Sequence, residues 1–244
     1  MAELSDSLGH RYVLDTKFVR TDLRSRERLA IAPAAMFKTY PDAEKIPLPG
    51  TWPDHGPGLI EILQQRRSLR KFSDQPLSLP DLALLLWACQ GITGQAGSYF
   101  FRTAPSAGAL YPLETYLAIE RVEGLSPGLY HFDVQGFQLE RLTEKSMAVL
   151  LAGACLDQGF MANAAVNFVW TAIFRRTMAK YGHRGLRYLC LDAGHVCQNL
   201  LLAAGFLGLG GCPVAAFFDD EVNDLLDVDG IEESTLYLAS LGAR

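Results

Sequence analysis

The sequence predicts a single α+β domain whose helices and short strands alternate along the chain and pack in layers. The chain has 244 residues, of which 49% are hydrophobic, and a chain of this length can bury a sizeable core. Segments with helical spacing of apolar residues alternate with short segments rich in β-branched and aromatic residues, and no internal repeat or low-complexity segment interrupts them. This interleaving indicates one layered domain.

Residues 1–57 are expected to form an extended arm over the surface rather than a domain. Several prolines divide this stretch, and proline disfavours the interior of helices and strands. They are Pro33, Pro41, Pro47, Pro49, Pro53 and Pro57. The folded domain is therefore assigned to residues 58–244.

Several segments of this domain are predicted to be helices, and the clearest is SLPDLALLLWACQG, residues 78–91. It begins with Ser78 and Asp81 in an S-x-x-D capping pattern, has Pro80 in its first turn and stops at Gly91. The other predicted helices cover residues 59–65, 144–156, 186–207 and 219–227.

The helix 186–207 is the longest and the most apolar. Apolar residues recur at positions 186, 189, 193, 196, 200, 204 and 207, which is the spacing of a helix with one face in a core. The same stretch also carries Arg187, Asp192, His195 and Asn199, which a membrane span disfavours. We therefore expect a buried helix of a soluble protein and no membrane partner.

The segments 113–120, 128–133, 165–174, 212–218 and 234–242 are predicted to be short strands. The segment TAPSAGALYP, residues 103–112, consists of small residues and prolines and is predicted to be a loop. Its small side chains would let the backbone approach another group closely.

Composition excludes several classes of function. The net charge is −5 and the sequence contains no long basic run, so it offers no footprint for nucleic acid. Its five cysteines include no C-x-x-C pair, which argues against a zinc site or a disulfide framework and favours a reducing, cytoplasmic location. Asp192, His195 and Asn199 share one stripe of the long helix, but this ligand set is too thin to predict a metal. The N-terminus lacks the apolar stretch of a signal peptide.

A compact basic cluster follows the predicted helix 59–65. The segment RRSLRK places Arg66, Arg67, Arg70 and Lys71 within six residues of an acidic chain. Guanidinium groups match the oxygens of a phosphate, and the hydroxyl of Ser68 would add a hydrogen bond. Cations near the C-terminal end of a helix also suit the helix dipole, so the residues alone leave a solvated surface cluster open.

Five segments together resemble the FMN-dependent nitroreductase superfamily, in particular its SagB-type dehydrogenase branch. They are RRSLRKFSDQPLSLPDLALLLWACQGI, RTAPSAGALYPLETYLA, GLYHFD, KYGHRGLRYLCLDAGHVCQNLLLAAGFLGLGG and FDDEVNDLL, and their order and spacing agree along nearly the whole chain. The resemblance implies a nitroreductase-like fold with a mixed β-sheet flanked by helices. It also implies a homodimer with the long central helix at its interface, and FMN as the cofactor.

The resemblance assigns three groups of residues to the flavin. Arg66, Arg67, Ser68 and Arg70 would hold the FMN phosphate, the ribityl chain and the pyrimidine edge of the ring. The loop residues Pro105, Ser106, Ala107, Gly108, Ala109 and Leu110 would cover the flavin from the partner subunit. Pro213, Val214, Ala215 and Ala216 would bring backbone against flavin N5, while the preceding Gly210 and Gly211 also fit an ordinary helix C-cap followed by a turn.

Three positions depart from the common nitroreductase pattern. Ala109 and Tyr111 stand where those enzymes carry Asn and Gln, and Ala215 replaces a frequent Glu near N5. These departures favour the SagB-type branch.

Lys180 and Tyr181 are the candidate catalytic residues. In SagB-type azoline oxidases a Lys-Tyr pair at this place lies beside the flavin and acts as general acid/base while thiazoline and oxazoline rings in a peptide become aromatic. A lysine has a reference pKa of about 10.4 and needs desolvation or nearby cations to act as a base near neutrality. Residues 175, 176, 184 and 187, all arginines, could supply that field. The residues alone also fit a solvated lysine and a packed tyrosine.

The function predicted is therefore oxidation of azolines in a peptide by hydride transfer to flavin N5. A second candidate is NAD(P)H-dependent reduction of a small nitroaromatic or quinone. A third is a flavin-binding scaffold subunit of a peptide-modification complex, without turnover of its own.

Overall fold

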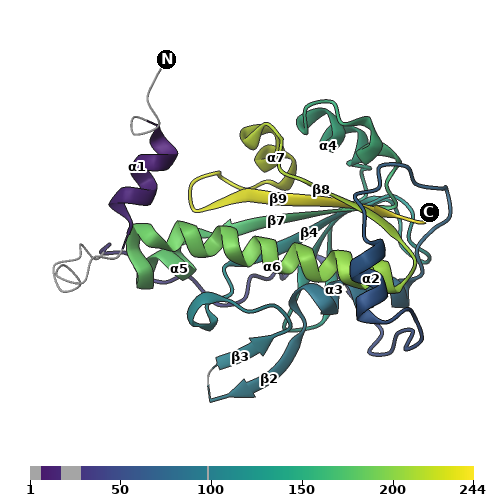
Figure 1. Cartoon of the computed structure of the whole chain (residues 1–244), viewed down its shortest axis with the longest axis horizontal. Coiled ribbons are helices and arrows are strands. Elements are labelled where there is room, and N and C mark those ends of the chain that lie inside the picture. Colours follow the sequence, from purple (N-terminus) through teal and green to yellow (C-terminus); the bar gives the residue numbers. More distant parts are fainter. Residues whose placement is uncertain (1–6, 18–28, 98) are drawn as a thin grey trace.

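The computed structural model describes residues 7–17, 29–97 and 99–244, and a seven-stranded sheet between two layers of helices forms its centre (Figure 1). The strand order is β1-β6-β5-β4-β7-β9-β8. All six pairings in this sheet are antiparallel, and the isolated bridges Ser68–Gly211 and Leu77–Val122 add parallel contacts. The strands are β1 (Glu44–Pro47), β4 (Leu113–Ile119), β5 (Gly128–Asp133), β6 (Gln138–Thr143), β7 (Val166–Ile173), β8 (Gly210–Val214) and β9 (Glu233–Gly242).

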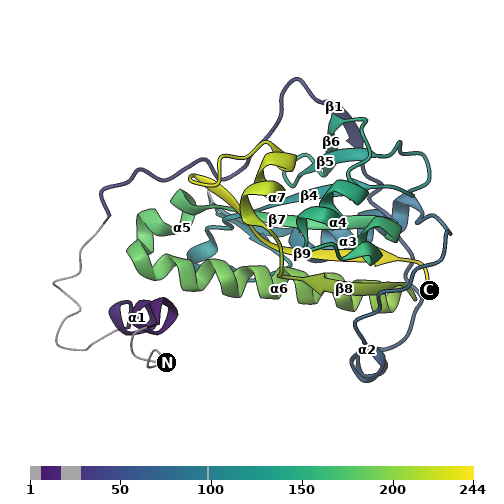
Figure 2. The same ribbon diagram turned by 90° about the horizontal axis from the view of Figure 1, so that it is seen from above.

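The described helices are α1 (Leu8–Asp15), α2 (Leu59–Gln65), α3 (Leu79–Gln90), α4 (Ala148–Ala154), α5 (Phe174–Tyr181), α6 (Gly185–Phe206) and α7 (Asp219–Leu226). The helix α6 runs along one face of the sheet next to α3, while α4 and α7 cover the other face (Figures 1 and 2). Each face therefore has its own hydrophobic core. The expected α+β fold with flanking helices and one long helix is confirmed.

The central strands β4 and β7 are covered on both faces. Every residue of β4 is buried, and the two strands pair from Leu113–Ala172 to Ile119–Val166 without interruption. Trp170 of β7 is fully buried in the larger core. Burial on both faces explains why these strands are almost continuously apolar in sequence, where a strand with one wet face would alternate.

The local signals at the ends of α3 act as predicted. Ser78 Oγ accepts a hydrogen bond from the backbone N–H of Asp81 at 3.2 Å. Gly91 follows the last turn, where a Cβ would lie only 2.3 Å from the Trp87 side chain. The first orphan amides of the helix are thus capped, and the glycine permits close approach of chain and indole.

The arm is not extended throughout. Residues 8–15 form α1, and residues 44–47 form β1, which pairs with β6 at the edge of the sheet. Ser7 caps α1 locally by accepting from the backbone N–H of His10, and Arg187 Nε donates to Thr16 Oγ1 just past its end at 2.8 Å. The remainder of the arm at residues 1–6 and 18–28 lies outside the described residues.

Four further elements were not predicted. They are β6, the helix α5, and the strands β2 (Ile92–Ala96) and β3 (Tyr99–Arg102), which form a hairpin beside the main body (Figure 1). The predicted strand 212–218 is shorter than expected: β8 ends at Val214, and Ala215 and Ala216 are exposed beyond the sheet.

The helical stretch Phe174–Phe206 is long and apolar enough to cross a membrane by length and composition alone. Its most apolar window is 44% buried within the chain, and α6 packs on α3, β8 and β9. The core helix of a layered domain has the same composition, and we interpret α6 in that way.

A buried charged network joins the sheet to α5 and to the arm. His131 of β5 lies between two carboxylates, with Nδ1 2.8 Å from Glu140 Oε2 and Nε2 3.0 Å from Glu114 Oε2. Arg176 of α5 pairs with the other oxygen of Glu114 at 2.5 Å and donates through Nε to the carbonyl of Ala35 at 2.6 Å. Burial by itself lowers the pKa of His131, but its hydrogen bonds with the two glutamates outweigh burial and raise that pKa.

We expect His131→Gln to remove a pH-dependent part of the stability. Because the folded-state pKa of His131 is raised, its contribution is complete below its ordinary value of 6.5 and is lost as pH rises through the raised pKa. At pH 6 the variant should lose about 1.5 to 3 kcal/mol of unfolding free energy, because Glu114 and Glu140 each lose a charged hydrogen-bond partner and keep only Arg176 and Lys45. Urea unfolding at pH 6 and 8.5 tests this, with His55→Gln, a side chain 94% exposed, as control. A difference between variant and wild type that stays the same at both pH values would contradict it.

Candidate cofactor and acid–base site

The basic cluster lies where α2 ends and the chain runs beside β8. Arg66 is the C-terminal cap of α2, and the backbone N–H of Leu69 donates to the carbonyl of Gly211 at 2.9 Å. A Cβ on Gly211 would lie 2.5 Å from Leu241, so this strand position has no room for a side chain. The left-handed glycine that ends α6 is Gly208, with φ +72°, and the C-cap interpretation of Gly210 and Gly211 is therefore wrong.

Three arginines line one cavity at this end of α6. Arg66 and Arg67 share it with Arg244, and Leu201, Ala204, Gly205 and Gly211 supply part of its walls. The guanidinium of Arg67 donates to the carbonyl of Gln64 at 3.0 Å, and that of Arg244 to the carbonyl of Leu209 at 3.2 Å. In the part of the chain that the structure describes, none of these arginines forms an ion pair with a carboxylate. Grouped cations without a carboxylate partner suit an anion.

Sequence reasoning missed Arg244. It is a single residue at the end of the chain, and no motif marks it. The structure explains its place, since the register of β8 and β9 pairs Gly210 with Gly242 and so carries the end of the chain to the cavity.

Arg70 lies further along β8. Its guanidinium is 5.8 Å from the ring centroid of Phe160. Its charge also lowers the pKa of the Cys212 thiol in part, although burial dominates and raises that pKa. Beyond β8 the chain leaves the sheet, and the carbonyl of Ala216 accepts a hydrogen bond from Gln158 at 3.1 Å. The structure thus brings two predicted groups, residues 66–70 and 213–216, together along one strand.

The third predicted group, residues 105–110, forms a loop with a 3-10 turn at Ala107–Ala109. Gly108, Ala109 and Tyr111 all have positive φ, at +67°, +55° and +44°. For a residue with a Cβ this region costs roughly 1 to 2 kcal/mol. The loop is therefore strained, and the surrounding structure must hold it.

Ser106 ties this loop to α6. Its hydroxyl donates to Asp192 Oδ2 at 2.6 Å and accepts from the backbone N–H of Tyr111 at 3.0 Å. Asp192 is only 5% exposed. Burial raises its pKa, and the bond from Ser106 holds that pKa down in part. In the predicted stripe Asn199 donates to the carbonyl of Ala88 at 3.0 Å. Within the described residues no cluster of three His, Cys, Asp or Glu side chains could hold a metal.

Lys180 and Tyr181 lie against this loop. A Cβ on Gly108 would be 2.7 Å from Tyr181 Oη and 2.8 Å from Lys180 Nζ. The ring of Tyr181 packs edge-on against Tyr188 with centroids 4.9 Å apart, while Lys180 is exposed. The pair ends α5, a separate helix that Gly182 terminates with φ +57°. No helix was predicted at these residues from the sequence.

The four arginines expected to act on Lys180 form ion pairs or hydrogen bonds with other groups. Arg175 pairs with Glu232, and Arg176 pairs with Glu114 in the buried network. Arg184 donates to the carbonyl of Thr16 at 2.6 Å and Arg187 to the hydroxyl of the same residue. Two of the four positive charges are thus neutralised by ion pairs, and the expected field is weaker than the sequence suggested.

The two halves of the candidate site stand at opposite ends of α6 (Figure 1). The arginine cavity includes Leu201, whereas Lys180 precedes Gly185. At about 1.5 Å per residue, residues 185 and 201 are roughly 24 Å apart along the axis, and Asp192, which holds the loop, is roughly 14 Å from residue 201. The arginine cavity and the Lys-Tyr pair are therefore separated along α6. Between them α6 exposes a stripe made of Cys190, Leu191, Gly194, His195 and Gln198.

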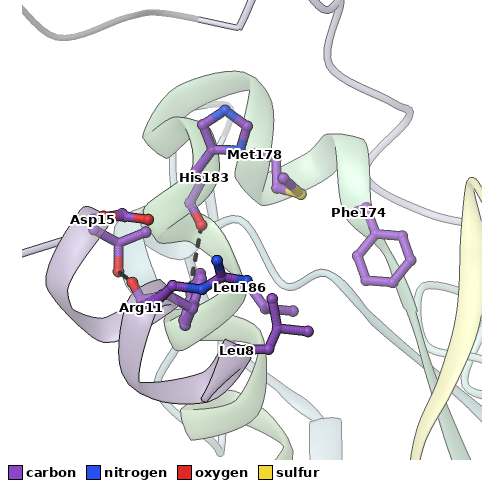
Figure 3. A pocket seen from close by; sticks show the side chains of 9 residues that line it. Leu8, Arg11, Asp15, Phe174, Met178, His183 and Leu186 are labelled. Carbon is purple, nitrogen blue, oxygen red and sulfur yellow. Dashed lines mark hydrogen bonds between the residues drawn. The ribbon is translucent and has the colours of Figure 1, made fainter. Parts of the chain in front are cut away.

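A cavity of about 690 Å³ lies between α1 and the helices α5 and α6 (Figure 3). Its walls include Leu8, Phe174, Met178 and Leu186, with Arg11, Asp15 and His183 as polar members. Tyr12 Oη donates to the carbonyl of His183 at 3.2 Å and so fixes α1 across the cavity. Lys180 and Tyr181 do not line it.

Gly108→Ala should disturb the Lys-Tyr pair beyond its effect on stability. We expect a loss of roughly 1 to 2 kcal/mol, because alanine disfavours the left-handed backbone. Gly124→Ala is the matched control, since Gly124 has φ +76° and an added Cβ would meet nothing within 4 Å. Only Gly108→Ala should change the tyrosine near-ultraviolet circular dichroism, because its Cβ displaces Tyr181. Identical spectra for the two variants would show that loop and pair are not in contact.

Comparison with known proteins gives a consistent family. The nitroreductase family model matches residues 63–243. The protein MJ1384 of Methanocaldococcus jannaschii, named as a nitroreductase, is 38% identical over 186 residues, covering 76% of this chain and 91% of its own. A crystal structure of a nitroreductase-like protein from Anabaena variabilis superposes with a TM-score of 0.79 at 27% identity, over 96% of this chain and 46% of that one.

A peptide-processing protein is also similar. The microcin B17-processing protein McbC of Escherichia coli is 30% identical over 135 residues, which are 52% of this chain and 49% of McbC. The solved microcin synthetase complex McbBCD, with truncated pro-MccB17 bound, matches with a TM-score of 0.63 at 22% identity, over 97% of this chain and 91% of the matched chain. The chain thus spans about half of McbC by sequence. From the family match and the fold together, this chain belongs to the nitroreductase family.

Proposed function

We propose that this chain is an FMN-dependent oxidoreductase of the SagB-type branch that oxidises azoline rings in a peptide. As a nitroreductase-family protein it is an oxidoreductase, and proteins of this family typically bind FMN. The observation that carries the finer assignment is the Lys180–Tyr181 pair held against the loop 105–110. The similarity to McbC, a microcin-processing protein, supports a peptide substrate.

The residues at the arginine cavity fit the phosphate of FMN. Arg66, Arg67 and Arg244 present guanidinium groups with no carboxylate partner among the described residues, beside a strand kept bare by Gly211. Guanidinium forks bind phosphate oxygens in pairs. Bound FMN would supply the ring nitrogen that accepts a hydride. Arg70 would face the pyrimidine edge of the ring, and the exposed backbone at Ala215 and Ala216 would approach it.

A homodimer would complete the site. Each chain would provide the arginine end of one site and the loop and Lys-Tyr pair of the other, since one chain holds these groups at opposite ends of α6. The stripe on α6 includes Leu191, which is 58% exposed, and α2 exposes Ile60 at 67%. Apolar side chains exposed on the elements that flank both halves fit a large hydrophobic interface.

Lys180 and Tyr181 would handle the proton of the reaction. Azoline oxidation removes a proton from one ring carbon and a hydride from the other, so a base must stand near the substrate. Lys180 Nζ, close to Tyr181 Oη at the surface of the loop, is the candidate base, and the tyrosine would orient it. We place the reaction in the cytoplasm, because the five cysteines are all free.

Two other functions have their own support. Reduction of a nitroaromatic or quinone with NAD(P)H is favoured by the name of MJ1384 and needs no base on the chain. A scaffold role in a peptide-modification complex is favoured by the McbBCD assembly. Purified protein that binds FMN and turns over nothing, alone or with partners, would support the scaffold.

Purified protein should be yellow and release FMN on denaturation. Arg66→Ala and Arg244→Ala should each weaken FMN binding about 10-fold or more, because each removes a charge-assisted hydrogen bond to phosphate. Equilibrium dialysis against free FMN measures this. Arg121→Ala, whose guanidinium donates to the carbonyl of Asn163, is the control and should bind FMN normally. Colourless protein that cannot be reconstituted with FMN would remove the central proposal.

Lys180→Ala and Tyr181→Phe should each reduce turnover of an azoline peptide on the order of 10²-fold while FMN stays bound. Mixed dimers of Lys180→Ala and Arg66→Ala chains should regain about a quarter of wild-type activity, because half of the dimers carry one site with neither substitution. The assay uses an FMN concentration well below the weakened Kd of Arg66→Ala, so that each variant alone stays far below the activity of the mixture.

The outcomes separate the candidate functions. A Lys180→Ala protein with full flavin and undiminished azoline oxidation would end the oxidase proposal. No recovery in mixed dimers of normal mass would show that both halves of the site come from one chain. Unchanged nitro or quinone reduction in Lys180→Ala would favour the reductase.

A further inference from the structure

The strained loop has two separate anchors. Its C-terminal end is held at Tyr111, whose carbonyl accepts from Arg176 at 3.2 Å and whose hydroxyl accepts from the N–H of Arg102 at 3.1 Å. Its middle, which faces the Lys-Tyr pair, is held through Ser106 on Asp192. The backbone of Ala107 also acts on the Asp192 carboxylate and lowers its pKa in part. The buried carboxylate of Asp192 therefore interacts with both a side chain and a backbone group of the loop segment that lies against Lys180 and Tyr181.

The hydroxyl of Ser106 has one hydrogen, and that hydrogen is used inside the chain. It points to Asp192 at 2.6 Å, while the oxygen accepts from Tyr111 N–H at 3.0 Å. A charged acceptor makes this bond stronger than one between neutral groups. The main contact of the Ser106 side chain therefore joins the loop to α6. If its hydroxyl hydrogen were donated to a flavin, the hydrogen bond to Asp192 would have to break.

The link between Ser106 and Asp192 affects Lys180 and Tyr181 because Gly108 lies between the link and this pair. Gly108 lies two residues after Ser106, has a left-handed backbone, and touches the region of Tyr181 Oη and Lys180 Nζ. Backbone in this region persists only where contacts over-determine it. Without Asp192 the segment 106–110 loses its link to α6, relaxes, and no longer supports the side chains of the pair.

We propose that Asp192 is a positioning residue that, through Ser106, holds the strained loop 105–110 against Lys180 and Tyr181. Asp192 itself touches neither the substrate nor the pair. It fixes the surface on which Lys180 Nζ rests and the shape of the loop edge turned toward the cofactor. The inference rests on the proposed function for the role of the pair, whereas the link from Asp192 to the loop stands on the geometry alone.

The test compares hydrogen exchange in the full-length protein as purified. In Asp192→Ala the amides of Ala107 and Tyr111 should exchange on the order of 10-fold faster or more than in wild type, since both lose acceptors that Asp192 fixes. Acetylation of Lys180, followed by mass spectrometry, should become several-fold faster because the loop no longer backs its amine. The exposed Lys145 should be acetylated at the wild-type rate.

Asp133→Ala is the matched control. Asp133 is also 5% exposed and also holds a turn, accepting from the backbone N–H of Gln135 at 3.0 Å and of Gly136 at 3.1 Å. Its loss should speed exchange at those two amides and leave the loop 105–111 and Lys180 unchanged. General destabilisation would instead speed exchange at both places in both variants, and that result would overturn the proposal.

Conservative variants test the route through Ser106. Ser106→Thr keeps a hydroxyl and should stay within about 2-fold of wild type, whereas Ser106→Ala should match Asp192→Ala. The double variant should be no faster than either single one, because both remove the same link. If Asp192→Ala does not fold, Asp192→Asn keeps one acceptor oxygen without the charge and should give an intermediate exchange rate.

Unchanged exchange at residues 107–111 and unchanged acetylation of Lys180 in a folded Asp192 variant would overturn the inference. Wild-type protein that never turns over an azoline peptide would instead count against the proposed function. The exchange and acetylation results do not depend on turnover, so the two failures are distinguishable.

Discussion

The packing of one 22-residue helix along the sheet sets the geometry of the whole molecule. Because α6 is straight and rigid, it fixes where its two ends lie, and each end carries a different kind of chemistry. Grouped guanidinium groups gather at its C-terminal end, and the loop with the Lys-Tyr pair gathers at its N-terminal half. Any account of function must therefore explain how groups that are separated along α6 act on one substrate.

The buried contacts of Arg176 join the sheet, the arm and the loop near Lys180 and Tyr181. One guanidinium contacts Glu114 of the central strand β4, the carbonyl of Ala35 in the arm and the carbonyl of Tyr111 in the loop. A buried charge is costly unless it is paired and hydrogen-bonded, and these contacts supply the ion pair and two hydrogen bonds of the Arg176 guanidinium. Sheet, arm, α5 and loop thus depend on one another, which is why a strained loop can persist there.

The elements that could be predicted from the sequence are those whose signals lie within one short segment of the chain. Single segments contain the capping residue Ser78, the apolar spacing of α6 and the mostly apolar strands β4 and β7. All of these were predicted. The strand β1 pairs with the distant β6, and α1 contacts residues 183 and 187, so no window of sequence reveals these two elements. The strand β6 forms a hairpin with the preceding β5, and this local element was not predicted. The same holds at the site. Motifs marked residues 66–70 and 105–110, but neither Arg244 nor Asp192 could be given its place without the register of β8 with β9 and the packing of loop on helix.

Three features of the chain are each unfavourable on their own, and the first two would be relieved by a bound partner. Like-charged arginines without carboxylate partners repel one another until an anion lies among them. Exposed apolar side chains on α2 and α6 gain free energy when a second apolar surface covers them. The positive φ angles at Ala109 and Tyr111 store strain that only a fixed loop geometry justifies. A guest that binds only the native state stabilises it in proportion to the logarithm of its concentration over Kd. In the function proposed here, a cofactor and a second chain would offset what a single chain leaves unsatisfied.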